Sequence, residues 1–140
     1  MVLTYMPALP EDAEQVFRLC RQLIDDYENL AAIDYEKVLG WVGRKIRGNI
    51  ASYTRVMAEG QIVGWYCLDK STGELDDLYI LEDFRGKGVG TKIIQKCIDE
   101  CPMPIWLYVF TKNTRAVALY ERMGFTIREK VGATRCIMKR

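Results

Sequence analysis

A glycine-rich segment in the middle of the chain has the composition of a phosphate-binding loop. It consists of Arg85, Gly86, Lys87, Gly88, Val89, Gly90 and Thr91. The glycines allow a tight turn that brings successive N–H groups to one point, and a helix beginning there would add unpaired donors and a positive dipole end. The Rossmann pattern G-x-G-x-x-G fails at Thr91, and the P-loop order G-K-[ST] is absent. A purely structural tight turn is therefore the alternative that this loop alone leaves open.

Histidine is absent from the sequence, which excludes several catalytic mechanisms. There is no imidazole for a Ser-His-Asp or Cys-His nucleophile, for a metal ligand or for a general base. The cysteines contain no C-x-x-C pair, so we expect no thiolate zinc site and no metal. We expect reduced thiols in a cytoplasmic protein. The cysteines are Cys20, Cys67, Cys97, Cys101 and Cys136.

The composition predicts one domain over residues 1–140. The chain has 140 residues, 49% of them hydrophobic and 28% charged, and a formal net charge of +1. A net charge this small argues against a basic surface for nucleic acid or an anionic membrane. No apolar run reaches the roughly 18 residues of a membrane span, and residues 1–5 have the pattern of a strand rather than a signal peptide. We expect neither nucleic acid nor a membrane as a partner.

The elements that must position the loop form one mixed α/β domain. Hydrophobic spacing predicts the order β-α-α-β-β-β-α-β-α-β-β. The predicted strands cover residues 2–6, 52–59, 61–69, 74–81, 105–110, 125–130 and 134–139. The predicted helices cover residues 11–29, 35–47, 88–101 and 113–123. Asp34 is the expected cap of the second helix, and the continuous apolar run at 105–110 indicates a strand buried on both faces.

Two motifs in the chain resemble those of the GNAT (GCN5-related N-acetyltransferase) superfamily. Arg85, Gly88 and Gly90 form R-x-x-G-x-G after a strand, and residues 113–125 match N-x-x-A-x-x-L-Y-x-x-x-G-F. The element order also matches, so the resemblance covers residues 2–139, although the first 50 or so resemble the family only in pattern. It implies a single mixed, mostly antiparallel twisted sheet flanked by helices, in which the strands at 74–81 and 105–110 are parallel and splayed apart.

The resemblance also implies acetyl-CoA as co-substrate. The pantetheine arm of CoA would lie between the splayed strands and hydrogen-bond to backbone groups of Leu78, Tyr79 and Ile80. Its pyrophosphate would rest on the N–H groups of residues 85–90, and Thr91 is also expected to bind the cofactor. Asn113 would donate toward the pantetheine arm, or it would serve only as a helix cap.

Transfer of an acetyl group to an amine requires a base, because an alkylammonium has a pKa near ~10.4 and must lose a proton. Glu74 is the leading candidate, since family members often carry a glutamate four residues before the position of Leu78. Asp76 is the close alternative, and relay through ordered water is compatible with either. Strand alternation predicts that residues 74, 76, 78 and 80 share one face and that Asp77 points to the other. A solvated acidic turn is the competing interpretation of these carboxylates.

The transition state also needs an oxyanion donor and an acid for the departing thiolate. A main-chain N–H near Leu78 or Tyr79 is the expected donor. Tyr120, in the L-Y pair of the second motif, is the expected acid, because a phenol of pKa near ~10 can donate to a thiolate as charge develops. The alternative for Tyr120 is an ordinary core tyrosine on an amphipathic helix.

The acceptor is predicted from charge patterning. Carboxylates greatly outnumber cations between residues 11 and 36, whereas Lys and Arg dominate from residue 85 onward. Two solvated helix faces of opposite charge would explain this charge pattern. A cationic acceptor met by the acidic region and a polyanionic acyl donor met by the basic region would also explain it. We expect a small primary amine to attack acetyl-CoA directly in a ternary complex, in a monomer or homodimer. The alternatives are acetylation of a protein N-terminus or lysine, and a catalytically silent acyl-CoA-binding module. The aromatic residues that could line the acceptor pocket or pack in the core are Trp41, Trp65, Tyr66 and Tyr79.

Overall fold

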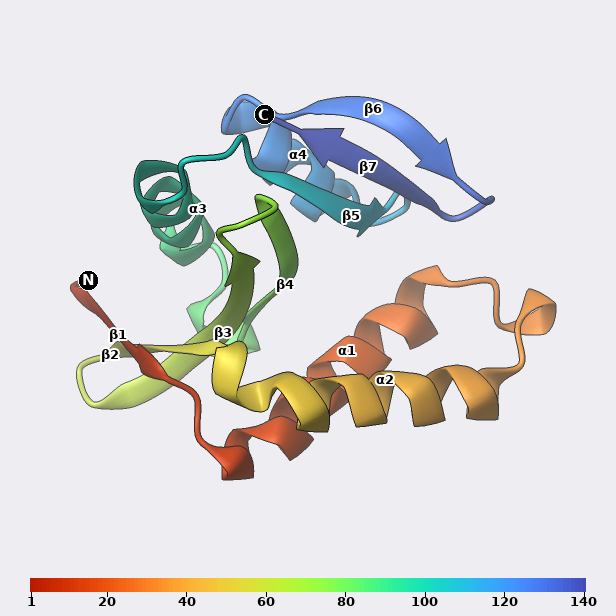
Figure 1. Ribbon diagram of the computed structural model, residues 1–140, viewed down its shortest axis with the longest axis horizontal. Helices are drawn as coiled ribbons and strands as arrows, with labels where there is room; N and C mark the ends of the chain where they lie inside the picture. The colour runs from red at the N-terminus through yellow and green to blue at the C-terminus, as the bar shows by residue number, and fades with distance from the viewer.

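Seven strands form one mixed sheet in the computed structural model, which describes residues 1–140 (Figure 1). The strand order is β1-β2-β3-β4-β5-β7-β6. The strands are β1 (Leu3–Pro7), β2 (Thr54–Ala58), β3 (Gln61–Asp69), β4 (Glu74–Ile80), β5 (Trp106–Phe110), β6 (Thr126–Val131) and β7 (Arg135–Lys139). All neighbours are antiparallel except β4 and β5. The predicted fold class and element order are confirmed.

Helices cover both faces of the sheet. They are α1 (Ala13–Tyr27), α2 (Tyr35–Asn49), α3 (Val89–Glu100) and α4 (Thr114–Arg122). Asp34 caps α2 as predicted, its carboxylate accepting from the Lys37 N–H at 3.2 Å. Short 3₁₀ turns precede or follow several elements, including Pro10–Asp12 immediately before α1. None of the helices combines the length and the apolar surface needed to cross a bilayer.

Two apolar clusters hold the layers together, one on each face of the sheet. The first joins strands β2–β5 and β7 to α3 and α4, with Ile93, Ile94 and Leu107 almost fully buried. The second joins α1 and α2 to the opposite face through Trp65 and Tyr79. Burial of this kind contributes about 25 cal/mol per Å² of apolar surface. The two faces of β4 therefore lead to two different environments.

Strands β4 and β5 are parallel neighbours for only a short distance. Their register contains one pair, Glu74 with Trp106, and the Trp106 N–H donates to the Gly73 carbonyl at 3.0 Å. Beyond this point the strands diverge, and Figure 1 shows β5 and β7 leaning away from β3 and β4. The splay leaves backbone groups of β4 without strand partners. We call the space between the two strands the V; the resemblance to the GNAT superfamily implies such a splay.

A bulge in β4 changes which side chains share a face. Cys67 pairs with Asp77 and Leu68 pairs with Leu75, so Asp76 has no partner on β3. A bulge of this kind shifts the alternation by one residue. Leu78 packs on the α3–α4 side, whereas Asp76 contacts Lys45 of α2 on the other side. The prediction that residues 74, 76, 78 and 80 share one face is therefore wrong.

Candidate active site

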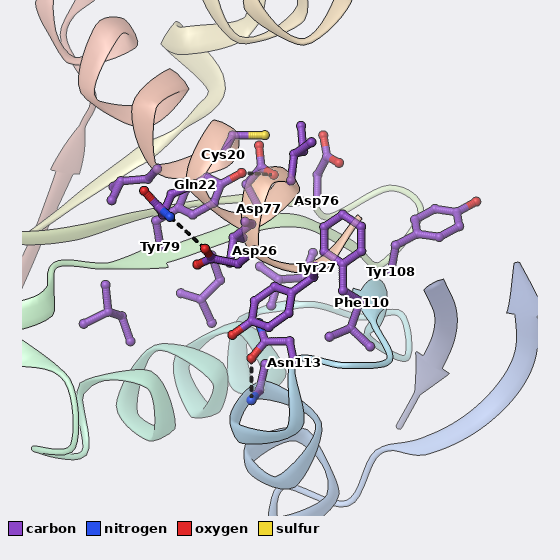
Figure 2. A pocket seen from close by; sticks show the side chains of 18 of the residues that line it. Cys20, Gln22, Asp26, Tyr27, Asp76, Asp77, Tyr79, Tyr108, Phe110 and Asn113 are labelled. Atoms are coloured by element: carbon purple, nitrogen blue, oxygen red, sulfur yellow. Dashed lines mark hydrogen bonds between the residues drawn. The ribbon is translucent and has the colours of Figure 1, made fainter. Parts of the chain in front are cut away.

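One large cavity of about 1070 Å³ runs along the V between β4 and β5. Its walls come from α1, α2, β4, β5, the start of α3 and α4. Figure 2 shows carboxylates and tyrosines from α1 and β4 above Asn113 of the α4 N-terminus. Residues 85–91 lie at one end of the cavity, and we call this segment the phosphate loop. We call the other end, which is lined by α1, α2 and the first residues of β4, the acceptor end.

The phosphate loop has the geometry of an anion site. Gly86 and Gly88 adopt left-handed conformations with φ of +74° and +79°, and Gly88 is the N-cap of α3. The backbone N–H groups of residues 86–91 have no acceptor within the protein. Free amides at a helix N-terminus fit the negatively charged phosphates of CoA.

Most of the predicted phosphate-loop residues line the cavity, with Lys87 as the exception. Those in the cavity wall are Arg85, Gly86, Gly88, Val89, Gly90 and Thr91. The Arg85 side chain donates to the Ile80 carbonyl at 2.9 Å and so ties the loop to the end of β4. The Lys87 ammonium lies 5.8 Å from the centre of the Phe84 ring, outside the wall. Lys87 can therefore contribute a backbone N–H to this site, while its side chain lies over the ring of Phe84.

The backbone of β4 offers hydrogen-bonding groups to the V in an alternating order. The Leu81 N–H donates to the Val63 carbonyl on β3 at 2.9 Å. In an antiparallel ladder, residues 79 and 81 then face β3, and residues 78 and 80 face away. Of the two main-chain N–H groups predicted as the oxyanion donor, those of Leu78 and Tyr79, this pattern favours Leu78. The Leu78 N–H is directed into the V, whereas that of Tyr79 is engaged with β3.

Tyr120 lies on α4 with its ring buried against Phe125, at 5.7 Å between ring centres. The ring belongs to the α3–α4 core cluster, yet the residue also lines the cavity. Its hydroxyl has no hydrogen-bond partner within the protein. Burial raises the pKa of the Tyr120 phenol, and the Asp77 carboxylate raises it further. The phenol is therefore protonated at neutral pH, as an acid must be, but the raised pKa makes it a weaker acid than a free phenol, so it would donate only as charge develops on the departing sulfur.

Asn113 acts as a cap while also lining the cavity. Its side-chain oxygen accepts from the Ala116 N–H at 3.3 Å, which fixes the first turn of α4 (Figure 2). The amide NH₂ has no acceptor within the protein. Capping and donation to a ligand, which the sequence presents as alternatives, are compatible here.

Asp77 lies in the wall of the acceptor end, where two tyrosine hydroxyls hold its side chain. It accepts from the Tyr79 hydroxyl at 2.8 Å (Figure 2). It also accepts from the Tyr53 hydroxyl. Burial raises the pKa of Asp77, and the neighbouring Asp76 raises it too, while the tyrosine donors lower it. Both carboxyl oxygens of Asp77 accept a hydrogen bond from a tyrosine, so Asp77 is less available as a general base than its position in the wall suggests.

Glu74 and Asp76 differ in their partners. The Lys45 ammonium lies 3.0 Å and 2.9 Å from the two carboxylate oxygens of Asp76. The Glu74 side chain makes no hydrogen bond or ion pair within the protein, and it lines the cavity. Burial, followed by repulsion from Asp76, raises the pKa of Glu74. Glu74 is thus a free carboxylate of increased basicity, as a general base should be.

Further carboxylates and aromatic rings complete the acceptor end. Asp26 accepts from the Gln22 amide at 2.8 Å, and Glu28 accepts from the Thr134 hydroxyl at 2.7 Å, across the mouth from α1 to the β6–β7 turn. The aromatic residues that line the cavity are Tyr27, Trp41, Tyr79, Phe84, Tyr108, Phe110 and Tyr120. Of the residues proposed from sequence, Trp41 and Tyr79 line the cavity, while Trp65 and Tyr66 pack in the core.

The cysteines are unpaired, and only Cys20 lines the cavity. Burial raises the pKa of its thiol to about 11. A thiol with that pKa is a poor nucleophile near neutral pH. The geometry therefore gives no support to transfer through an acyl-cysteine.

Comparison with known proteins identifies the family. The sequence model of the Acetyltransferase (GNAT) family matches residues 5–125. The chain belongs to the GNAT acetyltransferase family. This GNAT chain is 25% identical over 128 residues to the peptidyl-lysine N-acetyltransferase YjaB of Salmonella typhimurium, covering 91% of this chain and 86% of that protein.

Other relatives of this GNAT chain differ in length and in the activity for which they are named. The mycothiol acetyltransferase of Corynebacterium efficiens is 32% identical over 77 residues, covering 50% of this chain but only 26% of that protein. The chain thus spans about a quarter of the first curated relative it matches. A PaiA N-acetyltransferase from Thermoplasma acidophilum, solved in complex with coenzyme A, has a TM-score of 0.71 at 17% identity, covering 100% of this chain and 99% of that one.

Several wall residues of this GNAT protein, and the Tyr53 that holds Asp77 from behind the wall, carry no signal in the sequence. Lys45 lies on the amphipathic helix α2, outside both motifs, and Tyr53 precedes a strand. Asp26 and Glu28 contribute to the acidic charge of the first helix, but nothing in their spacing indicates that they face the cavity. Charge patterning alone could have found the region, though not the individual residues.

Proposed function

We propose that this protein transfers an acetyl group from acetyl-CoA to a small cationic primary amine by direct attack within a ternary complex. The observation that carries the proposal is one continuous cavity that joins free backbone amides at the phosphate loop to the unpartnered carboxylate of Glu74. Membership of the GNAT family supports acetyl transfer. The negative wall of the acceptor end supports a cationic substrate.

Each proposed catalytic role falls to a residue in the cavity wall. Acetyl-CoA, when bound, supplies the activated thioester carbonyl. Glu74 accepts the proton of the amine, directly or through water, and the Leu78 N–H is directed toward the space where an oxyanion would form. Tyr120, kept protonated by its environment, donates a proton to the departing thiolate. Asp76 remains the alternative base if Lys45 moves away.

The acceptor class can be tested with a panel of amines in the presence of acetyl-CoA, by following the release of free thiol. We expect kcat/KM for simple alkylamines to exceed that for amino acids by at least about tenfold, because the carboxylate of an amino acid is repelled by the acidic wall. A preference for acidic or neutral acceptors would contradict the proposal.

The same panel separates the alternative functions. A lysine peptide is included because a peptidyl-lysine acetyltransferase is among the relatives. A clear preference for that peptide over every alkylamine would favour protein acetylation. CoA binding without any thiol release would favour a silent acyl-CoA-binding module.

A pH profile tests Glu74 as the base. Its raised pKa means that the active, deprotonated form is lost as pH falls through a value above the usual ~4.3. We expect kcat to decline at that higher pH, and Glu74→Gln to lower kcat at least about tenfold and to abolish this limb. Glu36→Gln, at an exposed position on α2, is the matched control and should behave as wild type. If Asp76→Asn removes the limb while Glu74→Gln retains it, the base is Asp76.

A further inference from the structure

Lys45 places an ammonium group inside the acceptor end of the cavity. It projects from α2, and its nitrogen lies 3.0 Å and 2.9 Å from the two oxygens of Asp76 on β4. The Lys45 side chain is 35% exposed and the Asp76 side chain is 28% exposed. The pair therefore lies at the cavity surface, where a substrate can reach it.

An aromatic ring completes the surroundings of this ammonium. The Lys45 nitrogen is 5.6 Å from the centre of the Trp41 ring, which is 59% exposed and lines the same cavity. A carboxylate on one side and an aromatic face on the other form a cation site. Burial alone would lower the pKa of Lys45, but Asp76 outweighs it and raises the pKa overall. The site is thus occupied by a permanent positive charge from the protein itself.

The other carboxylates of the wall differ in whether a side chain of the protein already holds them. Asp77 is occupied by two tyrosine hydroxyls, Asp26 by an amide and Glu28 by a hydroxyl. Glu74 alone has no side-chain partner. These neutral donors fix the carboxylates in place without cancelling their charge, and Glu74 is left free to pair with the ammonium that reacts. On the same strand Asp76 is already paired with Lys45, so a second ammonium at that position would meet the Lys45 charge.

We propose that Lys45 is a specificity-determining residue, which fills the second cation position of the acceptor end and thereby selects monocationic amines over diamines. This deepens the proposed function, on which it rests, by naming the charge of the acceptor. A second ammonium on the substrate meets the Lys45 charge instead of the Asp76 carboxylate. Removing the Lys45 charge turns the same position into a binding site for that second ammonium.

Direct binding measurements test this independently of turnover. Butylamine and 1,4-diaminobutane share a four-carbon chain and differ by one ammonium, and each is titrated by calorimetry into the CoA-saturated protein. We expect wild type to bind the diamine no more tightly than the monoamine. We expect Lys45→Met, which retains an apolar stem, to bind the diamine at least about tenfold more tightly than wild type does, because an unpaired carboxylate in a partly buried site attracts a cation strongly. Its affinity for butylamine should change less than about threefold.

Two further variants locate the effect. Lys37→Met removes a lysine from an exposed position of the same helix, outside the cavity, and should leave both affinities unchanged. Lys45→Met combined with Asp76→Asn should lose the gain for the diamine, because the attraction resides in Asp76. Lys45→Gln provides a second test of the charge if the methionine variant is unstable to heat.

The outcomes separate this inference from the proposed function. The inference is overturned if the Lys45 variants bind the diamine no better than wild type, if the monoamine gains equally, or if they bind neither amine. Absence of acetyl transfer with the expected binding shifts would instead overturn the proposed function and leave the cation site in place.

Discussion

Replacement of Gly88 by glutamate is expected to abolish CoA binding. Gly88 has φ of +79° and forms the N-cap of α3, where the neighbouring amides are free. No atom lies within 4 Å of the position that a Cβ would take, so the new side chain extends into open space beside the loop. Its negative charge then occupies or repels the phosphate position, and such like-charge contacts cost several kcal/mol. We expect affinity to fall at least about a hundredfold in calorimetry.

A matched control separates charge at the site from strain in the backbone. Gly60, in the β2–β3 turn, has φ of +78° and also has no atom within 4 Å of its Cβ position. Gly60→Glu imposes the same conformational cost away from the cavity and should retain CoA affinity. Wild-type binding itself is expected in the micromolar range and should weaken with salt. Unchanged affinity in Gly88→Glu would remove the phosphate-loop assignment.

Replacement of Tyr120 by phenylalanine is expected to lower kcat by at least about tenfold while CoA affinity stays nearly unchanged. General acid catalysis commonly contributes about 10²–10⁴-fold, and the variant removes only the donor. The ring keeps its contact with Phe125, and the lost hydroxyl leaves no partner unsatisfied. The thermal midpoint should therefore change little. Steady-state kinetics and calorimetry on the same preparation provide both quantities.

Tyr66→Phe is the control for this change. Tyr66 belongs to the same core cluster and is buried, but it does not line the cavity. Its phenylalanine variant should retain kcat. If Tyr120→Phe keeps full turnover with the chemical step shown to limit the rate, then water or another group is the acid. A joint loss of folding and CoA affinity would identify Tyr120 as a core residue only.

The competing roles of the three β4 carboxylates show where sequence reasoning reaches its limit. Strict alternation separates Asp77 from Glu74 and Asp76. The structure shows a bulge at Asp76, which places Asp76 on the α2 side, with Lys45 as its partner. A bulge depends on the register with β3 and on contacts across the sheet, and alternating polarity in one strand does not contain that information.

The sequence by itself determined the elements and the glycine turn before α3, because both depend on neighbouring residues. Hydrophobic spacing defines strands and helices, and glycines at 86 and 88 are placed where φ is positive. The tertiary structure alone decided which charged groups meet. Lys45 reaches Asp76 across 31 residues of chain, and Tyr53 reaches Asp77 across 24. Such pairs form only when packing of α1 and α2 against the sheet brings distant segments together, and that packing, rather than any local pattern, sets the charge that an acceptor meets.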